Sequence, residues 1–158
     1  MPRDTRPATQ KPERSVTMTE LVLPSHTNAH GTIFGGVVMS WIDIAGAIAA
    51  GRYARSAVVT VSIDSMHFLV PIKIGHIVEL EASVTHVGST SMEVEAIVRA
   101  ENPVSGQTRM TTQAYLTYVA VDEYGRPKVV PSWRPKTRQE KEKWAAAEAR
   151  RAQRLKLA

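Results

Sequence analysis

The sequence predicts an α+β protein in which a single long helix is followed by an antiparallel sheet. The first observation is a run of nineteen residues, 33–51, in which Asp43 is the only ionisable side chain. The second is a change of hydrophobic period after residue 56, from the 3.6 residues of a helix to the 2 residues of a strand. A lone apolar helix before a series of strands is typical of a sheet that wraps around the helix.

Residues 33–51 are predicted to form a helix that is buried on nearly all sides, because apolar residues surround its whole circumference. Gly35 and Gly36 mark its start, and Gly51 marks its end. A membrane span of this length is disfavoured. The central Asp43 would cost about 2.5–3.5 kcal/mol on insertion, and the alanines and glycines around it offset little of that.

Alternating apolar and polar residues predict four long strands joined as a meander. They cover residues 57–70, 76–87, 90–100 and 109–121. Glycine-containing turns at 87–89 and 102–106 suit hairpins. Because one helix covers only one face of such a sheet, we expect a second subunit to cover the other face, which makes the protein a dimer at least.

The chain is predicted to have three parts: a disordered arm at 1–15, one domain at 16–132 and a basic helical extension at 133–158. The net charge of +5 conceals a split, since residues 15–132 carry −3 and both ends are positive. The ends lack the interleaved aromatic residues of a nucleic-acid platform, so we expect no nucleic-acid partner. The extension is expected to be a solvated helix, with packing on a partner subunit or anion binding as the alternatives.

The composition excludes several chemistries. The 158 residues contain no cysteine, so disulfides, thiolate metal sites and a cysteine nucleophile are ruled out. His67, His76 and His86 lack metal-ligand spacing, and we expect no metal. Neither a secretory signal nor a membrane segment is visible, so we expect a cytoplasmic protein that does not bind membranes.

Asp43 is the first candidate for a catalytic residue. A carboxylate inside an apolar helix is costly to bury and needs a reason. The alternative is that Asp43 pairs with a basic or polar group at a subunit interface. The residue types and their pattern leave both possibilities open.

The loop before the helix carries Asn28, His30 and Thr32 and runs into Gly35-Gly36. The free N–H groups of a helix start, which a substrate reaches easily where there is no side chain, suit a developing oxyanion. The alternative is a capped loop, with Asn28 or Thr32 bonded to nearby backbone and His30 on the surface. A Gly-Gly before a helix is a weak motif by itself.

Four stretches together carry a family resemblance. They are TNAHGTIFGGVVMSWIDIAGAI at 27–48, VVTVSIDSMHFLVPIKIG at 58–75, the turn at 87–91, and LTYVAVDEYGRP at 116–127. In this order they resemble the acyl-CoA thioesterase branch of the hotdog superfamily, the bacterial acyl-CoA hydrolases and the vertebrate cytosolic long-chain hydrolase. The resemblance covers roughly residues 20–131.

The resemblance implies a hotdog fold, in which an antiparallel sheet wraps one long helix, and a double-hotdog dimer, often as a trimer of dimers. It implies an enzyme of fatty-acid metabolism that hydrolyses acyl-CoA to a free fatty acid and CoA. No cofactor is expected, because CoA is part of the substrate. The expected assembly is therefore a homo-oligomer: a dimer at least, and a homohexamer where three dimers associate.

The resemblance also implies roles for individual residues. Asp43 would act as general base or as covalent nucleophile, beside the pre-helix loop of the other subunit. Asn28 would orient the water or the carbonyl, and backbone N–H groups of Gly35 or Gly36 would form the oxyanion hole. Thr60, on the first predicted strand, is a third candidate side chain, with an ordinary sheet threonine as the alternative.

One departure from the vertebrate pattern affects this assignment. The vertebrate motif has an asparagine shortly before a His-Gly-Gly, whereas Phe34 precedes the two glycines here, as in the bacterial group. Phe34 has no hydrogen-bond donor on its side chain, so the oxyanion hole is expected to rely on backbone N–H groups. His30 and Thr32 are rivals of Asn28 for the assisting role.

By resemblance, the turn formed by Gly88, Ser89, Thr90 and Ser91 lies near the CoA nucleotide and offers hydroxyl and backbone donors to phosphate. Residues 57–63 are candidates to pair with the pantetheine amides, since an edge strand presents free N–H and C=O groups. Three cations are possible phosphate partners: Arg52, Arg55 and Lys73.

Two other functions were weighed. A hotdog 3-hydroxyacyl dehydratase would need a catalytic histidine paired with an acid across the dimer, and His30 is the candidate for it. A non-catalytic acyl-CoA-binding or transcriptional domain would bind CoA without turnover. The presence of Asp43 in the helix argues against this second function.

Overall fold

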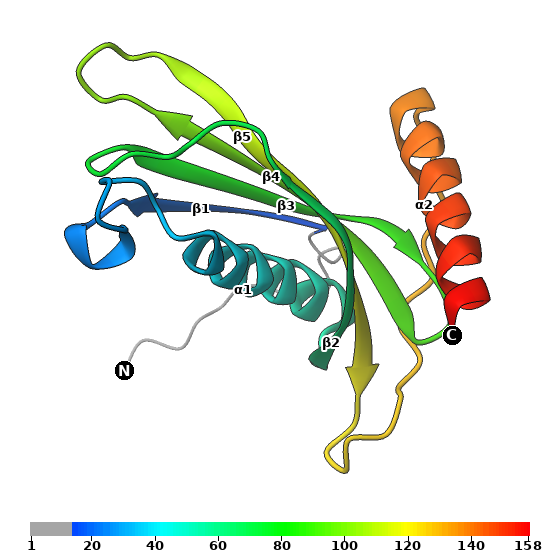
Figure 1. Cartoon of the computed structure of the whole chain (residues 1–158). Helices are drawn as coiled ribbons and strands as arrows, with labels where there is room; N and C mark the ends of the chain where they lie inside the picture. The colour runs from blue at the N-terminus through cyan, green and yellow to red at the C-terminus, as the bar shows by residue number, and fades with distance from the viewer. Residues whose placement is uncertain (1–13) are drawn as a thin grey trace, which may run out of the picture.

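The computed structural model describes residues 14–158, which form one antiparallel sheet with a long helix on each face (Figure 1). The elements are β1 (Ser15–Leu21), η1 (Pro24–His26), α1 (Gly35–Ala54), β2 (Ala57–Phe68), β3 (Ile77–Val87), β4 (Ser91–Glu101), β5 (Thr108–Val121) and α2 (Arg138–Leu157). The five strands lie in the order β1-β3-β4-β5-β2. The first thirteen residues of the predicted arm lie outside the described residues.

α1 is the predicted apolar helix, but it is displaced towards the C-terminus. It ends at Ala54, and Arg55 caps it in the left-handed conformation with φ of 49°. The prediction that Gly51 ends the helix was therefore wrong: Gly51 lies in the last turn, where its carbonyl accepts the N–H of Arg55. The helix is also not buried all round in one chain, because Met39 and Ile44 are exposed on the side away from the sheet.

The inner face of the sheet packs on α1 as the alternation predicts. Residues two apart along β3, β4 and β5 are fully buried beneath the helix. They include Val78, Leu80, Ala82, Val94, Ala96, Val98, Ala114, Leu116 and Tyr118. Small residues alternate with larger ones on this face, which lets the helix approach the strands closely.

The predicted four-strand meander was wrong in two respects. A fifth strand, β1, pairs with β3 along the register Ser15↔Ser83 to Leu21↔Ile77. β2 pairs with β5 and not with β3, so it lies at the opposite edge of the sheet from β1. The segment between β2 and β3 is therefore a crossover and not a hairpin, and it is held to the pre-helix loop by the bond from Ile33 N–H to the carbonyl of Ile72.

α2 lies on the outer face of the sheet, on the opposite side from α1 (Figure 1). Its cations meet acidic side chains that point outward from the strands: Lys143 bonds Glu95 at 2.8 Å, and Arg150 bonds Glu93 at 2.7 Å. Both glutamates are buried beneath the helix. The expectation of a solvated extension was wrong, because α2 itself covers part of the sheet face that a second subunit was expected to cover.

Candidate active site

Asp43 lies at the middle of α1, and its carboxylate is held by two hydroxyl groups from the sheet. Thr60 of β2 donates to Asp43 Oδ1 at 2.8 Å, and Tyr118 of β5 donates to the same oxygen at 2.9 Å. Thr60 and Tyr118 are paired across neighbouring strands, and an irregularity in the pairing follows Thr60. Irregularities of this kind commonly re-aim side chains beside active sites.

The two hydrogen bonds leave one carboxylate oxygen of Asp43 uncommitted. Within residues 14–158, Oδ1 accepts both hydroxyl groups, and no hydrogen bond is made by Oδ2. Asp43 is half-buried, so solvent reaches part of this residue in a single chain. A fixed carboxylate with one free oxygen is chemically equipped to act as a general base or as a nucleophile.

The hydroxyl of Tyr118 is a permanent donor at neutral pH. Burial raises the pKa of Tyr118 above its ordinary value, and the hydrogen bond to the negatively charged Asp43 raises that pKa further. The hydroxyl also lies 3.0 Å from the backbone carbonyl of Asp43. The tyrosine therefore supports both the side chain and the helix backbone at this position.

The start of α1 has the free N–H groups that the sequence predicts. Phe34 is the N-cap and makes no side-chain cap, while Gly35 and Gly36 are exposed. An added β-carbon on Gly36 would meet nothing within 4 Å. However, Gly35 and Asp43 are eight residues apart, which is about 12 Å along a helix. Within one chain, the helix start and the Asp43 carboxylate are therefore too far apart to hold the same carbonyl group.

Asn28 is committed to its own loop. Its Oδ1 accepts the N–H groups of His30 at 2.9 Å and Thr32 at 3.2 Å, and its Nδ2 donates to the Thr32 hydroxyl at 2.8 Å. This is the capped-loop arrangement that was considered as an alternative. One N–H of the Asn28 amide is left for another acceptor. The structure does not bring Asn28 and Asp43 of the same chain together in a hydrogen bond.

The turn from Gly88 to Ser91 lies near the Asp43 cluster. Ser91 pairs with Val119, next to the row in which Met92, Tyr118 and Thr60 lie side by side on three strands. Neighbouring strands are about 4.8 Å apart, so the turn is about 10 Å from β2. The turn also borders α2: the guanidinium carbon of Arg151 lies 3.7 Å from the place of a β-carbon on Gly88.

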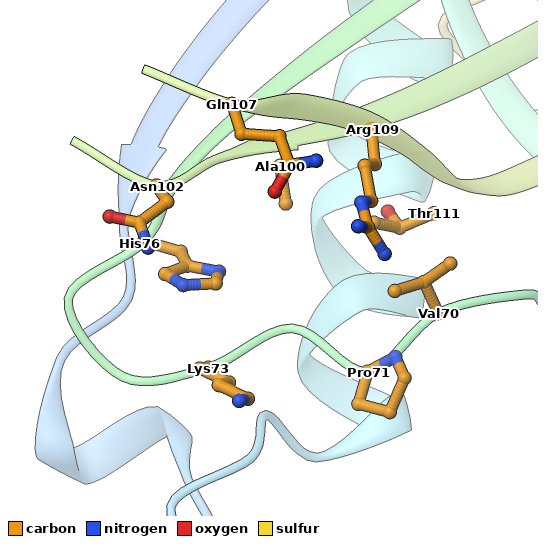
Figure 2. Close-up of a pocket in the computed structure, with 9 residues that line it drawn as sticks. All are labelled: Val70, Pro71, Lys73, His76, Ala100, Asn102, Gln107, Arg109 and Thr111. Carbon is orange, nitrogen blue, oxygen red and sulfur yellow. The ribbon is translucent and has the colours of Figure 1, made fainter. Parts of the chain in front are cut away.

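A pocket of about 270 Å³ lies between β5, the end of β4 and the crossover segment, and basic side chains line part of it. In Figure 2, the side chain of Arg109 points from β5 into this pocket. The segment that carries Pro71 and Lys73 lies below it, and His76 lies to one side. Among residues 14–158, no acidic side chain lines this pocket. The structure thus places Lys73, one of the three predicted phosphate partners, in a basic pocket away from Asp43, whereas Arg52 and Arg55 lie at the end of α1.

The surface around Asp43 and Thr60 is apolar. β2 is an edge strand with exposed apolar side chains, and α1 adds further exposed apolar residues beside it. These residues are Phe34, Met39, Ile44, Val59, Val61 and Ile63. A long apolar edge strand is a template for pairing with another chain. The Asp43 cluster therefore opens onto a surface that is suited to burial against a second copy.

Two further properties concern only the part of the chain that the structure describes. Residues 14–158 contain no group of three or more His, Asp or Glu side chains placed to hold a metal ion. Among the same residues, neither helix has the length and apolar character needed to cross a membrane.

Tyr118 and Gly46 are components of the site that the sequence did not single out. Tyr118 lies two residues after Leu116 and so falls on the same face of the predicted strand at 109–121, but its hydroxyl was given no partner. The available signal was a tyrosine on an inward face, since a buried hydroxyl needs an acceptor. Gly46 lies one turn after Asp43, and a β-carbon there would be 2.3 Å from the Tyr118 hydroxyl oxygen.

Comparisons with known proteins point to one family. A family model described as the thioesterase superfamily matches residues 30–107. The acyl-CoA thioester hydrolase YciA of Escherichia coli K12 is 39% identical over 123 residues, which cover 76% of this chain and 93% of that protein.

Solved structures agree with this match. An apo-hexameric acyl-CoA thioesterase superposes with a TM-score of 0.86 at 48% identity, covering 90% of this chain and 91% of its own. An acyl-CoA hydrolase from Staphylococcus aureus, solved with butyryl coenzyme A, coenzyme A and coenzyme A disulfide, has a TM-score of 0.83 at 38% identity, covering 91% and 88%. Its structures include variants named Asp43Ala, Thr60Ala and Asn28Ala.

Proposed function

The chain belongs to the thioesterase superfamily, and from this premise we propose that it hydrolyses acyl-CoA to a free fatty acid and CoA. The observation that carries the proposal is the Asp43 carboxylate, which two hydroxyl groups hold through Oδ1 while Oδ2 makes no hydrogen bond to any residue from 14 to 158. The names of the relatives, acyl-CoA thioester hydrolase and acyl-CoA hydrolase, support the substrate class. The residues replaced in the Staphylococcus aureus variants have the same types and numbers as Asp43, Thr60 and Asn28 here.

In the proposed reaction, the thioester carbonyl lies at a helix start, where the N–H groups of Gly35 or Gly36 stabilise the oxyanion. Losing one such donor typically costs about 3–4 kcal/mol of transition-state stabilisation. Asp43 takes a proton from a water that attacks the carbonyl, and the CoA thiolate leaves and is protonated. The alternative is direct attack by Oδ2 on the carbonyl, which expels the CoA thiolate and gives a mixed anhydride; water then cleaves the anhydride to the fatty acid and the free Asp43 carboxylate.

The site is proposed to combine two chains. The helix start and Asp43 are about 12 Å apart in one chain, so the carbonyl held at the start of one helix would face Asp43 of a second subunit. The apolar surface of β2 and α1 supports a symmetric dimer in which each subunit completes the site of the other. The hexameric assembly of a solved relative supports a trimer of such dimers.

The CoA phosphates are proposed to bind at Gly88, Ser89, Thr90 and Ser91, with Arg151 of α2 as their cation. We expect Arg151→Gln to raise KM for acyl-CoA about tenfold with kcat unchanged, because a charge-assisted hydrogen bond contributes about 1.5–3 kcal/mol. Steady-state kinetics measure this.

The matched control for Arg151→Gln is Arg109→Gln, which removes a guanidinium from the pocket in Figure 2. Arg109→Gln is expected to leave KM unchanged. If the Arg109 variant raises KM and the Arg151 variant does not, the phosphates bind in that pocket and the turn is not the nucleotide site.

The proposed function is tested by free-thiol release from a panel of acyl-CoA thioesters from acetyl to palmitoyl, measured beside water loss from a 3-hydroxyacyl-CoA. Thiol release is expected. Water loss without thiol release would identify a dehydratase, and CoA binding without either reaction would identify a binding domain. The lack of a cofactor and a cytoplasmic location are part of the proposal.

A further inference from the structure

We propose that Tyr118 is a positioning residue for catalysis: its buried hydroxyl fixes the orientation of the Asp43 carboxylate so that Oδ2 faces the substrate. This inference rests on the proposed function, since it takes Asp43 as the catalytic carboxylate. Tyr118 is not expected to contact the substrate. It acts only through Asp43.

The geometry favours Tyr118 over Thr60 as the fixed support. Tyr118 is fully buried, whereas Thr60 is exposed at the edge of the sheet. The Tyr118 hydroxyl lies inside the core of a single chain, so water cannot take its place as a donor without opening that core. A hydrogen bond in the low dielectric of a core is also stronger than one exposed to solvent.

The contact of Tyr118 with the backbone strengthens its positioning effect. The same hydroxyl lies 2.9 Å from Asp43 Oδ1 and 3.0 Å from the Asp43 carbonyl, so its position relative to the helix is fixed together with the carboxylate. Two donors hold Oδ1, and Oδ2 makes no hydrogen bond within residues 14–158, so it is left for the reaction. A carboxylate displaced by about 1 Å can lose about a hundredfold in rate.

Gly46 shows that this close approach depends on the sequence of α1. A β-carbon at Gly46 would lie 2.3 Å from the Tyr118 hydroxyl oxygen and 3.0 Å from two ring carbons. The helix therefore accommodates the tyrosine only because residue 46 has no side chain. The spacing of Asp43 and Gly46, one turn apart, places the carboxylate and the space for its support on the same side of the helix.

The test is Tyr118→Phe, which removes the hydroxyl and keeps the ring. We expect kcat for acyl-CoA to fall about ten- to a hundredfold while KM and the affinity for CoA stay within twofold. Adding Tyr118→Phe to Asp43→Asn is expected to lower the residual rate no further, because the hydroxyl acts through the carboxylate. The matched control is Tyr115→Phe, on the same strand but on the outer face, where the hydroxyl bonds Glu95.

The outcomes separate this inference from the proposed function. Wild-type kcat in Tyr118→Phe, with a lower melting temperature alone, would mean that Tyr118 has only a structural role. If Asp43→Asn keeps its turnover, the assignment of Asp43 fails. If Tyr118→Phe does not fold, Thr60→Val is compared in its place. A smaller fall of kcat in Thr60→Val than in Asp43→Asn supports a second, buried support for the carboxylate, and an equal fall contradicts it.

Discussion

Replacement of Asp43 by asparagine is expected to lower acyl-CoA turnover by about a hundred- to ten-thousandfold, the usual contribution of a general base. The asparagine oxygen can still accept the hydroxyl groups of Thr60 and Tyr118, so the fold and the assembly are expected to persist. The amide can neither take a proton from water nor attack the thioester. Free-thiol release measures the rate, and circular dichroism with size-exclusion chromatography checks the fold.

The control for this variant is Asp64→Asn. Asp64 is a second carboxylate nearby in the sequence, on β2, but it pairs with Arg154 of α2. Its replacement is expected to leave the rate within a fewfold of the wild type. Turnover retained by Asp43→Asn would remove Asp43 from the mechanism, and the half-buried carboxylate would then have a structural role at a subunit interface.

The second large effect is expected from Gly46→Ala, which should destabilise the protein by about 1–3 kcal/mol, the usual cost of overpacking a core. The new methyl group would collide with the Tyr118 hydroxyl at 2.3 Å, so either the helix or the ring must move. We also expect a loss of turnover, since the same movement displaces the support of Asp43. Urea denaturation measures the free energy of unfolding.

A matched control lies in the same helix. An added β-carbon at Gly51 would be 3.5 Å from the nearest atom, which is ordinary contact, so Gly51→Ala should be neutral or stabilise the helix by up to about 1 kcal/mol. Tyr118→Phe should relieve only part of the damage in Gly46→Ala, because the ring carbons remain at 3.0 Å. If Gly46→Ala is as stable as Gly51→Ala, the close approach of Tyr118 does not constrain the helix.

The main features of the fold followed from local patterns in the sequence. Four of the strands were predicted from the two-residue period, because burial on one face imposes that alternation. The predicted hotdog fold is confirmed. The single charge in residues 33–51 was enough to identify Asp43 as a candidate, because the burial of a carboxylate is costly wherever it occurs.

Features that depend on contacts between distant residues were not predicted. β1 was missed because its seven residues are recognisable as a strand mainly through their pairing with β3. β2 was assigned to the wrong neighbour because a meander pairs strands that are consecutive in the chain, whereas the chain crosses the sheet between β2 and β3. Tyr118 is 75 residues from Asp43, so only the folded sheet shows that the two side chains meet.

The ion pairs of α2 were not predicted for the same reason: they join residues that are distant in the sequence. Its cations were counted correctly, but they appeared to be solvated charges because their partners Glu93 and Glu95 lie in a distant strand. The burial of those glutamates was not predicted. The strand pattern shows which residues share a face of the sheet, but it does not show that a helix of the same chain covers that face.

The proposed active site is shared by two chains, and complementation between two inactive variants tests this most directly. Asp43→Asn supplies an intact helix start, and Asn28→Ala supplies an intact carboxylate while loosening the loop that Asn28 braces. The two proteins are unfolded together, refolded and assayed for free-thiol release. Random pairing in a symmetric dimer makes about half of the dimers mixed, and each mixed dimer has one intact site out of two. Recovery to about a quarter of wild-type activity is therefore predicted. A mixture no more active than the separate variants would contradict the shared site.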